Sequence, residues 1–265
     1  MPNYPNLVQL FRQQFNHPRL DLTLSPLDES NLTQSKLGGI PYLEEEEALP
    51  RDLEGYPMRL LAQINYEQMA GHALKGFPQK GLIQFWISQT DPYFGRGPQI
   101  GSTDQKDWRI LHYPEIHQSL TPAKIQSLMA LNNQEIKPSF PLAIDQAYAI
   151  DFEKTIIPPL WNIYGSHQDV QAFLAPLSSL EQEGFKDEVF EQWDPYGSMI
   201  GGYPAFNDQD PRWQIRDWQG FDTVLLQLDS QGPIHWPDDG IGQFMIRRED
   251  LLNLNFNRVL YNWGS

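Results

Sequence analysis

The chain contains no cysteine, which excludes disulfides, thiolate nucleophiles and cysteine-type zinc sites. It also lacks an apolar run near the roughly 20 residues that span a membrane, and its first residues do not form a signal peptide. Positive charge is scarce: 19 Lys and Arg stand against 34 Asp and Glu, a net charge of −15. Nucleic-acid backbones and anionic membranes need basic surfaces, so we expect a cytoplasmic protein that binds neither.

Apolar residues are plentiful in spite of this acidity. The 265 residues are 40% hydrophobic and include 8 Trp, which suffices for a large core. The 22 Pro and 19 Gly restrict long regular elements and favour loops. We therefore expect an α+β fold with mostly antiparallel sheets, short helices and long loops.

One pattern of three segments occurs twice in the chain. The first copy is Gly-Gly-Ile-Pro-Tyr-Leu at 38–43, Leu-Leu-Ala-Gln-Ile-Asn at 60–65 and Gly-Leu-Ile-Gln-Phe-Trp-Ile at 81–87; the second is Gly-Gly-Tyr-Pro-Ala-Phe at 201–206, Leu-Leu-Gln-Leu-Asp at 225–229 and Gly-Ile-Gly-Gln-Phe-Met-Ile at 240–246. Gly and Pro indicate a turn in the first segment, and the short apolar segments indicate buried strands. The spacing is too long for a solenoid, so we expect an internal duplication.

Each copy carries a glutamine in its first strand, Gln63 and Gln227. A buried amide without partners costs roughly 1–3 kcal/mol, so both side chains must be hydrogen-bonded. Bonding to loop backbone is the favoured interpretation, because most buried polar groups are satisfied internally. The alternative is that the two glutamines line a ligand cleft.

Periodicity predicts further elements outside the repeated segments. Helices are expected over 6–15, 66–75 and 247–254, from Thr121-Pro122 onward, and from a Ser166 cap through Val170 and Leu174; extended segments are expected over 20–24, 108–113, 143–154 and 259–263. The region 91–195 has no visible copy in the other half, and we interpret it as decoration or linker between the repeats.

Patterns that could hold a metal or phosphate are weak. The glutamates at 44–47 lack the glycine and turn spacing that lets ligands converge, so a solvated loop is favoured. His112 and His117 are five apart without a visible third ligand. No Gly-x-Ser-x-Gly motif or phosphate loop is present. We expect no cofactor, no metal and no catalytic residue, which argues against an enzyme.

Polar residues near the second repeat form the best candidate patch. Asp210 and Arg212 could pair or receive a carboxylate ligand, Trp236 offers a stacking face, and Asp238 could cap backbone amides. The structural alternative is that Asp210 and Asp238 bond loop amides and that Arg212 bridges them. The candidate ligand-binding residues are therefore Gln63, Asp210, Arg212, Gln227, Trp236 and Asp238.

These motifs, together with Asp-Pro-Arg at 210–212, Trp-Pro-Asp-Asp-Gly at 236–240 and the tail 256–263, resemble the YwqG-like family of bacterial proteins. Two positions depart from the family pattern: Pro237 replaces a glycine, and Leu49-Pro50 replaces Trp-Pro. The resemblance implies an α+β fold with internal duplication and a cytoplasmic bacterial setting, without an established activity. We expect one compact domain, 1–265, with repeats at about 18–90 and 196–263 around the middle segment 91–195.

Two functions are compatible with these observations. The first is a non-enzymatic protein-binding role, immunity-like, in which the acidic chain holds a basic protein partner. The second is a hydrolase or small-molecule-binding protein with a pocket between the two repeats. A deep pocket containing ionisable groups would favour the second.

Overall fold

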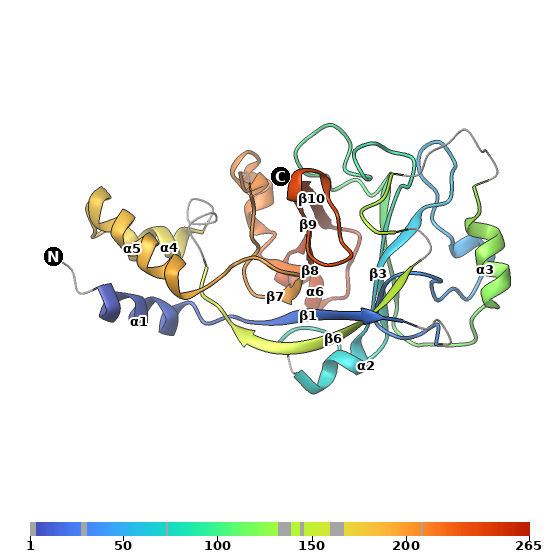
Figure 1. Ribbon diagram of the computed structural model, residues 1–265, viewed down its shortest axis with the longest axis horizontal. Helices are drawn as coiled ribbons and strands as arrows, with labels where there is room; N and C mark the ends of the chain where they lie inside the picture. The colour runs from blue at the N-terminus through green and yellow to red at the C-terminus, as the bar shows by residue number, and fades with distance from the viewer. Residues whose placement is uncertain are drawn as a thin grey trace.

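The computed structural model describes residues 4–27, 31–72, 74–131, 139–143, 146–159, 167–207 and 209–265. Within these ranges the chain has an α+β fold, with ten strands in one curled antiparallel sheet and six α-helices around it (Figure 1). The strands are β1 (Pro18–Pro26), β2 (Lys36–Gly38), β3 (Arg59–Asn65), β4 (Leu82–Ile87), β5 (Trp108–Tyr113), β6 (Ala147–Ile156), β7 (Met199–Gly201), β8 (Thr223–Asp229), β9 (Ile241–Ile246) and β10 (Val259–Gly264). The helices are α1 (Tyr4–Gln14), α2 (Tyr66–Met69), α3 (Pro122–Met129), α4 (Gln168–Leu174), α5 (Ser179–Gln192) and α6 (Arg248–Leu252), with 3-10 turns η1 (Glu46–Ala48), η2 (Ala70–His72), η4 (Pro211–Trp213), η5 (Arg216–Gly220) and η6 (Pro237–Asp239).

The strand order is β10-β9-β8-β7-β1-β6-β2-β3-β4-β5. A four-stranded meander, β2 to β5, therefore lies at one end, and a second, β7 to β10, lies at the other. The two long strands β1 and β6 pair with each other in the middle. β1 also pairs with β7, and β6 also pairs with β2, so each meander continues into a central strand.

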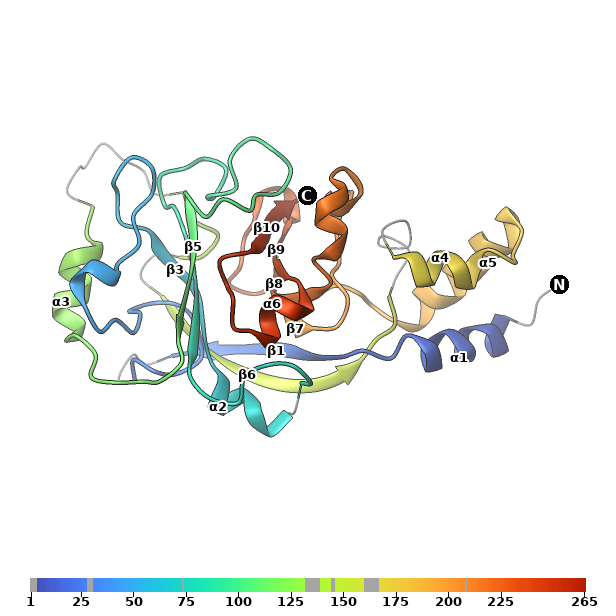
Figure 2. The same ribbon diagram turned by 180° about the vertical axis from the view of Figure 1, so that it is seen from behind.

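The sheet curls until its two ends meet. Phe85 of β4 and Phe244 of β9 pack with ring centroids 4.9 Å apart, and Trp108 of β5 lies 5.5 Å from the ring of Tyr261 in β10. Backbone bonds close the contact, because Ser102 and Tyr261 exchange N–H···O bonds of 2.7 and 2.8 Å. The main core lies inside this curl, between the two meanders (Figure 2).

A helical lobe of α1, α4 and α5 extends from one end of the molecule (Figure 1). Its own apolar cluster includes Phe11, Val170 and Phe185. The α5 helix starts at a capping box in which Ser178 and Glu181 bond each other's backbone N–H groups. In the described ranges, no helix combines the length and apolar character that crossing a bilayer requires.

The predicted helix over 6–15 corresponds to α1, although α1 packs in the lobe and Leu10 is exposed. The predicted strands over 20–24, 108–113 and 259–263 lie in β1, β5 and β10, and the extended segment 143–154 overlaps β6. The expected Ser166 cap lies outside the described residues; His167 Nδ1 accepts the Val170 N–H at the start of α4. The middle segment 91–195 supplies β5 and the central strand β6 as well as the lobe helices.

Gln63 is fully buried and holds the loop that carries the first Gly-Gly turn. Its Oε1 accepts the Tyr42 N–H at 3.0 Å and the Gln84 amide at 2.8 Å. Its Nε2 donates to the carbonyls of Leu32 and Gln34 at 2.8 and 2.9 Å. Every polar atom of this amide therefore bonds within the protein, as the structural interpretation predicts.

Gln227 makes corresponding bonds beside the second turn and is also fully buried. Its Oε1 accepts the Ala205 N–H at 2.8 Å, and its Nε2 donates to the Gly197 carbonyl at 2.9 Å. On the paired strand, Gln243 donates to the Ala205 carbonyl at 2.6 Å. The backbone of Ala205 is thus held on both sides by amide side chains.

We predict that Gln63→Leu lowers the free energy of unfolding by about 3 kcal/mol and Gln227→Leu by about 2 kcal/mol, because each leaves buried backbone groups unpaired and Gln63 serves more of them. Urea unfolding of the full chain measures both. The control is Gln13→Leu on the exposed face of α1, which should change stability by at most about 0.5 kcal/mol. Equal stability of all three variants would contradict the structural role of the buried amides.

Candidate functional site

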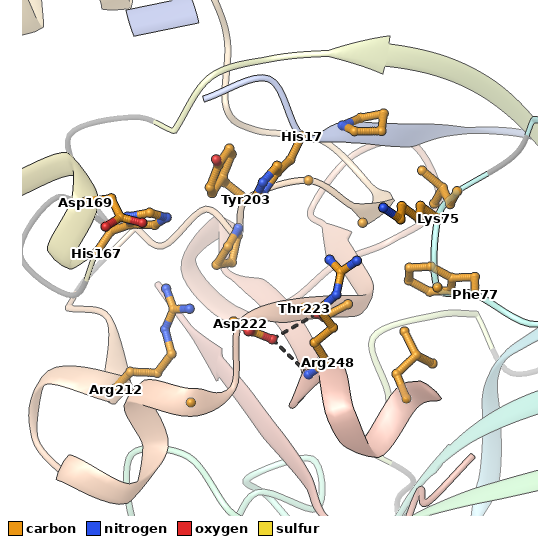
Figure 3. A pocket seen from close by; sticks show the side chains of 18 of the residues that line it. His17, Lys75, Phe77, His167, Asp169, Tyr203, Arg212, Asp222, Thr223 and Arg248 are labelled. Carbon is orange, nitrogen blue, oxygen red and sulfur yellow. Dashed lines mark hydrogen bonds between the residues drawn. The ribbon is translucent and has the colours of Figure 1, made fainter. Parts of the chain in front are cut away.

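A cleft of about 820 Å³ opens beside the second Gly-Gly turn (Figure 3). Its walls come from distant parts of the chain: the start of β1, the loop 74–77 after η2, the start of α4, the turn 201–204, the segment around η5, and α6. The loop 74–77 belongs to the first half of the chain, whereas the turn and α6 belong to the second. The cleft therefore lies where the two halves meet.

The turn needs glycine at both positions. Gly201 and Gly202 have φ of +73° and +67°, in the left-handed region that side chains with a Cβ rarely adopt. A Cβ at Gly202 would lie 2.7 Å from Arg19 Cβ, and one at Gly201 would lie 3.1 Å from the Pro18 carbonyl. This close approach to the start of β1 brings His17 to the edge of the cleft.

Three cationic side chains line the cleft of this acidic protein: Lys75, Arg212 and Arg248. Arg212 is buried and already bound, since its Nε lies 2.9 and 3.1 Å from the Asp210 carboxylate oxygens and its Nη1 donates to the Phe221 carbonyl at 3.0 Å. Lys75 and Arg248 differ, because neither side chain has a hydrogen-bond or ion-pair partner among the described residues. These two cations are available to an anionic group.

Aromatic rings form one wall of the cleft. The rings of His17 and Tyr203 stack with centroids 5.0 Å apart, and His167 meets the same tyrosine edge-on at 5.5 Å. Phe77 contributes apolar surface beside Lys75 (Figure 3).

Burial lowers the pKa of both cleft histidines, which favours the neutral imidazole. Desolvation lowers the pKa of His17 below its usual value, and the Arg248 guanidinium lowers it further, against the opposing Asp222 carboxylate. Desolvation also lowers the pKa of His167, with Asp169 opposing the shift. The available positive charge of the cleft at pH 7 therefore comes from Lys75 and Arg248, since Arg212 is paired with Asp210.

Two carboxylates also line the cleft, Asp169 and Asp222. Asp222 is hydrogen-bonded within the protein, since its Oδ1 accepts the backbone N–H of Arg248 at 3.0 Å and the side-chain hydroxyl of Thr223 at 3.0 Å. Asp169 lies in the first turn of α4 and has no hydrogen-bond partner among the residues that the structure describes. Both carboxylates are exposed, but Asp169 is the one without a described hydrogen-bond partner.

The six residues singled out from the sequence do not form one site. Gln63 and Gln227 hold the two turns from inside, and Asp210 and Arg212 form a buried pair in which the Arg212 N–H also bonds Asp210 at 3.0 Å. Of these residues, only Arg212 lines the cleft. The predicted pairing of Asp210 with Arg212 is present, and Arg212 Nη1 also donates to the Phe221 carbonyl.

Trp236 and Asp238 lie away from the cleft. Trp236 is buried, donates its indole N–H to the Leu228 carbonyl at 2.9 Å and stacks on Trp263 at 6.0 Å. A Cβ at Gly242 would lie 2.3 Å from its ring, so this glycine makes room for the indole. Asp238 is exposed at φ +50° inside η6, and its carboxylate has no hydrogen-bond partner among the described residues.

His112 and His117, the histidines considered as metal ligands, belong to no group of three ligating side chains among the described residues. His117 Nδ1 lies 3.3 Å from Glu44, whereas His112 packs against Phe256 with centroids 4.7 Å apart. In the described part of the chain, no three His, Asp or Glu side chains gather as metal ligands. Sequence reasoning missed the cleft residues His17, Lys75 and Arg248, because nothing in the chain order links them.

The fold and the cleft together define an α+β protein with a ligand-sized depression between its halves. Residues 35–264 match the family described as a domain of unknown function, DUF1963, and the chain belongs to that family. No curated protein matches the chain. The match begins after β1, so His17 lies outside it, whereas the cationic and acidic residues of the cleft lie within it. The function must be inferred from the chemistry of the cleft.

We predict that Gly202→Ala destabilises the protein by about 2–3 kcal/mol, from backbone strain and from the clash with Arg19. The matched control is Gly55→Ala, where φ is +86° but a Cβ would meet no atom within 4 Å, so strain alone should cost about 1 kcal/mol. Thermal and urea unfolding compare the two variants. If the two substitutions cost the same, the close approach of the turn to β1 contributes nothing.

Proposed function

We propose that the protein is a binding protein whose small ligand lies in the cleft, with an anionic group of the ligand between Lys75 and Arg248. The observation that carries this proposal is that these two cations have no partner among the described residues. Elsewhere, described lysines such as Lys80, Lys106 and Lys124 lie within 3.3 Å of a carboxylate. In a chain of net charge −15, unpaired cations that share a cleft favour an anionic ligand.

The size and lining of the cleft support the same role. Ligand pockets typically enclose about 300–1,000 Å³ and combine apolar walls with a few polar groups. The cleft, at about 820 Å³, lies in this range and carries aromatic rings between its charged ends. The cleft also lies between the two halves of the chain. The small-molecule-binding hypothesis from the sequence expects a pocket between the two repeats.

Binding rather than catalysis is proposed because the cleft lacks an activated nucleophile in the part that the structure describes. The hydroxyl of Thr223, which lines the cleft, donates to Asp222 rather than to a histidine. His167 Nδ1 accepts a backbone N–H and is not oriented by a carboxylate. A nucleophile paired with an oriented base is what covalent catalysis requires.

The proposal includes an internally duplicated, YwqG-like fold. In both meanders the strand after the turn contains a register shift near its start, between Leu60 and Ala62 in β3 and between Val224 and Leu226 in β8. Gln63 pairs with Gln84, and Gln227 pairs with Gln243. The order of strands supports units of β1 to β5 and β6 to β10, which exchange their first strands. These units include β5 and β6, which lie outside the repeats expected from the sequence at about 18–90 and 196–263.

Superposition tests the duplication. In an experimentally determined structure, residues 35–87 should superimpose on residues 198–246 with the paired glutamines coincident. Failure of the two segments to superimpose would reject a common origin and leave the ligand proposal unaffected.

The alternative role, an immunity-like protein that holds a basic partner, is supported by net charge alone. Pull-down with the full chain at physiological salt tests it. Recovery of a specific basic protein whose binding survives Arg248→Ala would favour this role over the cleft.

We predict that citrate or pyrophosphate binds the full chain at one saturable site, and that Arg248→Ala and Lys75→Ala each weaken binding about tenfold, because each removes a charge-assisted contact. Isothermal titration calorimetry measures the affinities. Lys106→Ala is the matched control, since Lys106 is exposed, pairs with Asp104 and lies outside the cleft. The proposal fails if neither anion binds, or if all three variants bind as tightly as the unaltered protein.

A further inference from the structure

The charges of the cleft are separated along its length. Lys75 and Arg248 lie toward one end, whereas Asp169 and His167 lie at the other, with His17 and Tyr203 between them (Figure 3). This separation matters because a ligand held only by cations would leave the far end without a partner.

The Asp169 end carries negative charge in spite of the nearby Arg212. The Asp210 carboxylate neutralises that guanidinium, since the two groups lie 2.6 Å apart at their closest atoms and both are buried. His167 adds no charge at neutral pH, because desolvation lowers its pKa. Asp169 itself has no described partner. The available charge at this end is therefore a single carboxylate.

The other end carries positive charge. Lys75 and Arg248 have no hydrogen-bond or ion-pair partners among the described residues. These two cations outnumber Asp222, which keeps its charge while its Oδ1 accepts the Arg248 N–H and the Thr223 hydroxyl. A ligand carboxylate placed here meets two cations. An ammonium group placed here meets repulsion from both of them.

Neutral groups line the space between the charged ends. The stacked rings of His17 and Tyr203 form one wall, and Gly201 and Gly202, which have no side chains, also line the cleft. The amides of Gln168 and Gln219 also line the cleft and offer both donors and acceptors. Such a surface suits an uncharged, hydrogen-bonding chain that links two oppositely charged ends.

We propose that the ligand is a zwitterion, a short peptide with free termini, whose carboxylate lies between Lys75 and Arg248 and whose ammonium group lies at Asp169. This inference rests on the proposed function of the cleft and specifies its ligand class. The recognition is by charge at both ends, so a peptide blocked at either terminus loses one of its contacts.

Triglycine, N-acetyl-triglycine and triglycine amide test the inference as probes in calorimetric titrations of the full chain. Free triglycine should bind, and each blocked peptide should bind about tenfold more weakly, because each has lost one charged contact. In Asp169→Asn, triglycine and N-acetyl-triglycine should bind equally. In Arg248→Gln, triglycine and triglycine amide should differ less than they do with the unaltered protein. Lys106→Ala should bind all three as the unaltered protein does.

The outcomes separate this inference from the proposed function. If citrate or pyrophosphate binds in an Arg248-dependent manner but the blocked and free peptides bind equally or not at all, the zwitterion inference is overturned and the anion cleft stands. If neither the anions nor triglycine bind, both proposals fail. Asp169→Asn and Arg248→Gln replace exposed side chains, and an unchanged unfolding midpoint confirms that each variant is folded.

Discussion

The pairing of β1 with β6 joins the two halves of this protein, and the remaining structure depends on it. Each central strand also pairs with the meander that follows the other one, β1 with β7 and β6 with β2. The halves therefore share backbone hydrogen bonds and do not merely touch through side chains. The curl of this shared sheet brings Phe85 against Phe244 and makes one continuous core.

The position of the cleft follows from this arrangement. Buried amides fix the two glycine turns, and the second turn approaches the start of β1 closely because it carries no side chain. The curl then brings the loop 74–77 from the first half against that turn, where a Cβ at Gly201 would lie 3.1 Å from Leu74. Lys75 and Arg248, from opposite halves, thereby line the same space.

The sequence predicts much of the sheet and little of the cleft. Local signals were sufficient for the glycine turns, the glutamine strands and β5, because alternation, turn residues and buried amides act over a few residues. The α5 helix escaped prediction although Ser178 and Glu181 form a capping box, since its apolar residues do not follow a clear stripe. The sequence predicted that Trp236 could stack on a ligand, but its indole is buried against Gly242, where a side chain would leave no room. His17, Lys75 and Arg248 meet only through the tertiary fold, so no local pattern joins them.

The pairing of β1 with strands that are made much later also affects how the chain folds during synthesis. β1 is among the first segments to emerge, yet β6 and β7, which cover its two edges, are made over 120 residues later. At a synthesis rate of about 5–20 residues per second, the backbone donors and acceptors of β1 have no partner strand for several seconds or longer. Unpaired strand edges of this kind promote association between chains, so the late synthesis of its partner strands exposes β1 to such association until the second half is complete.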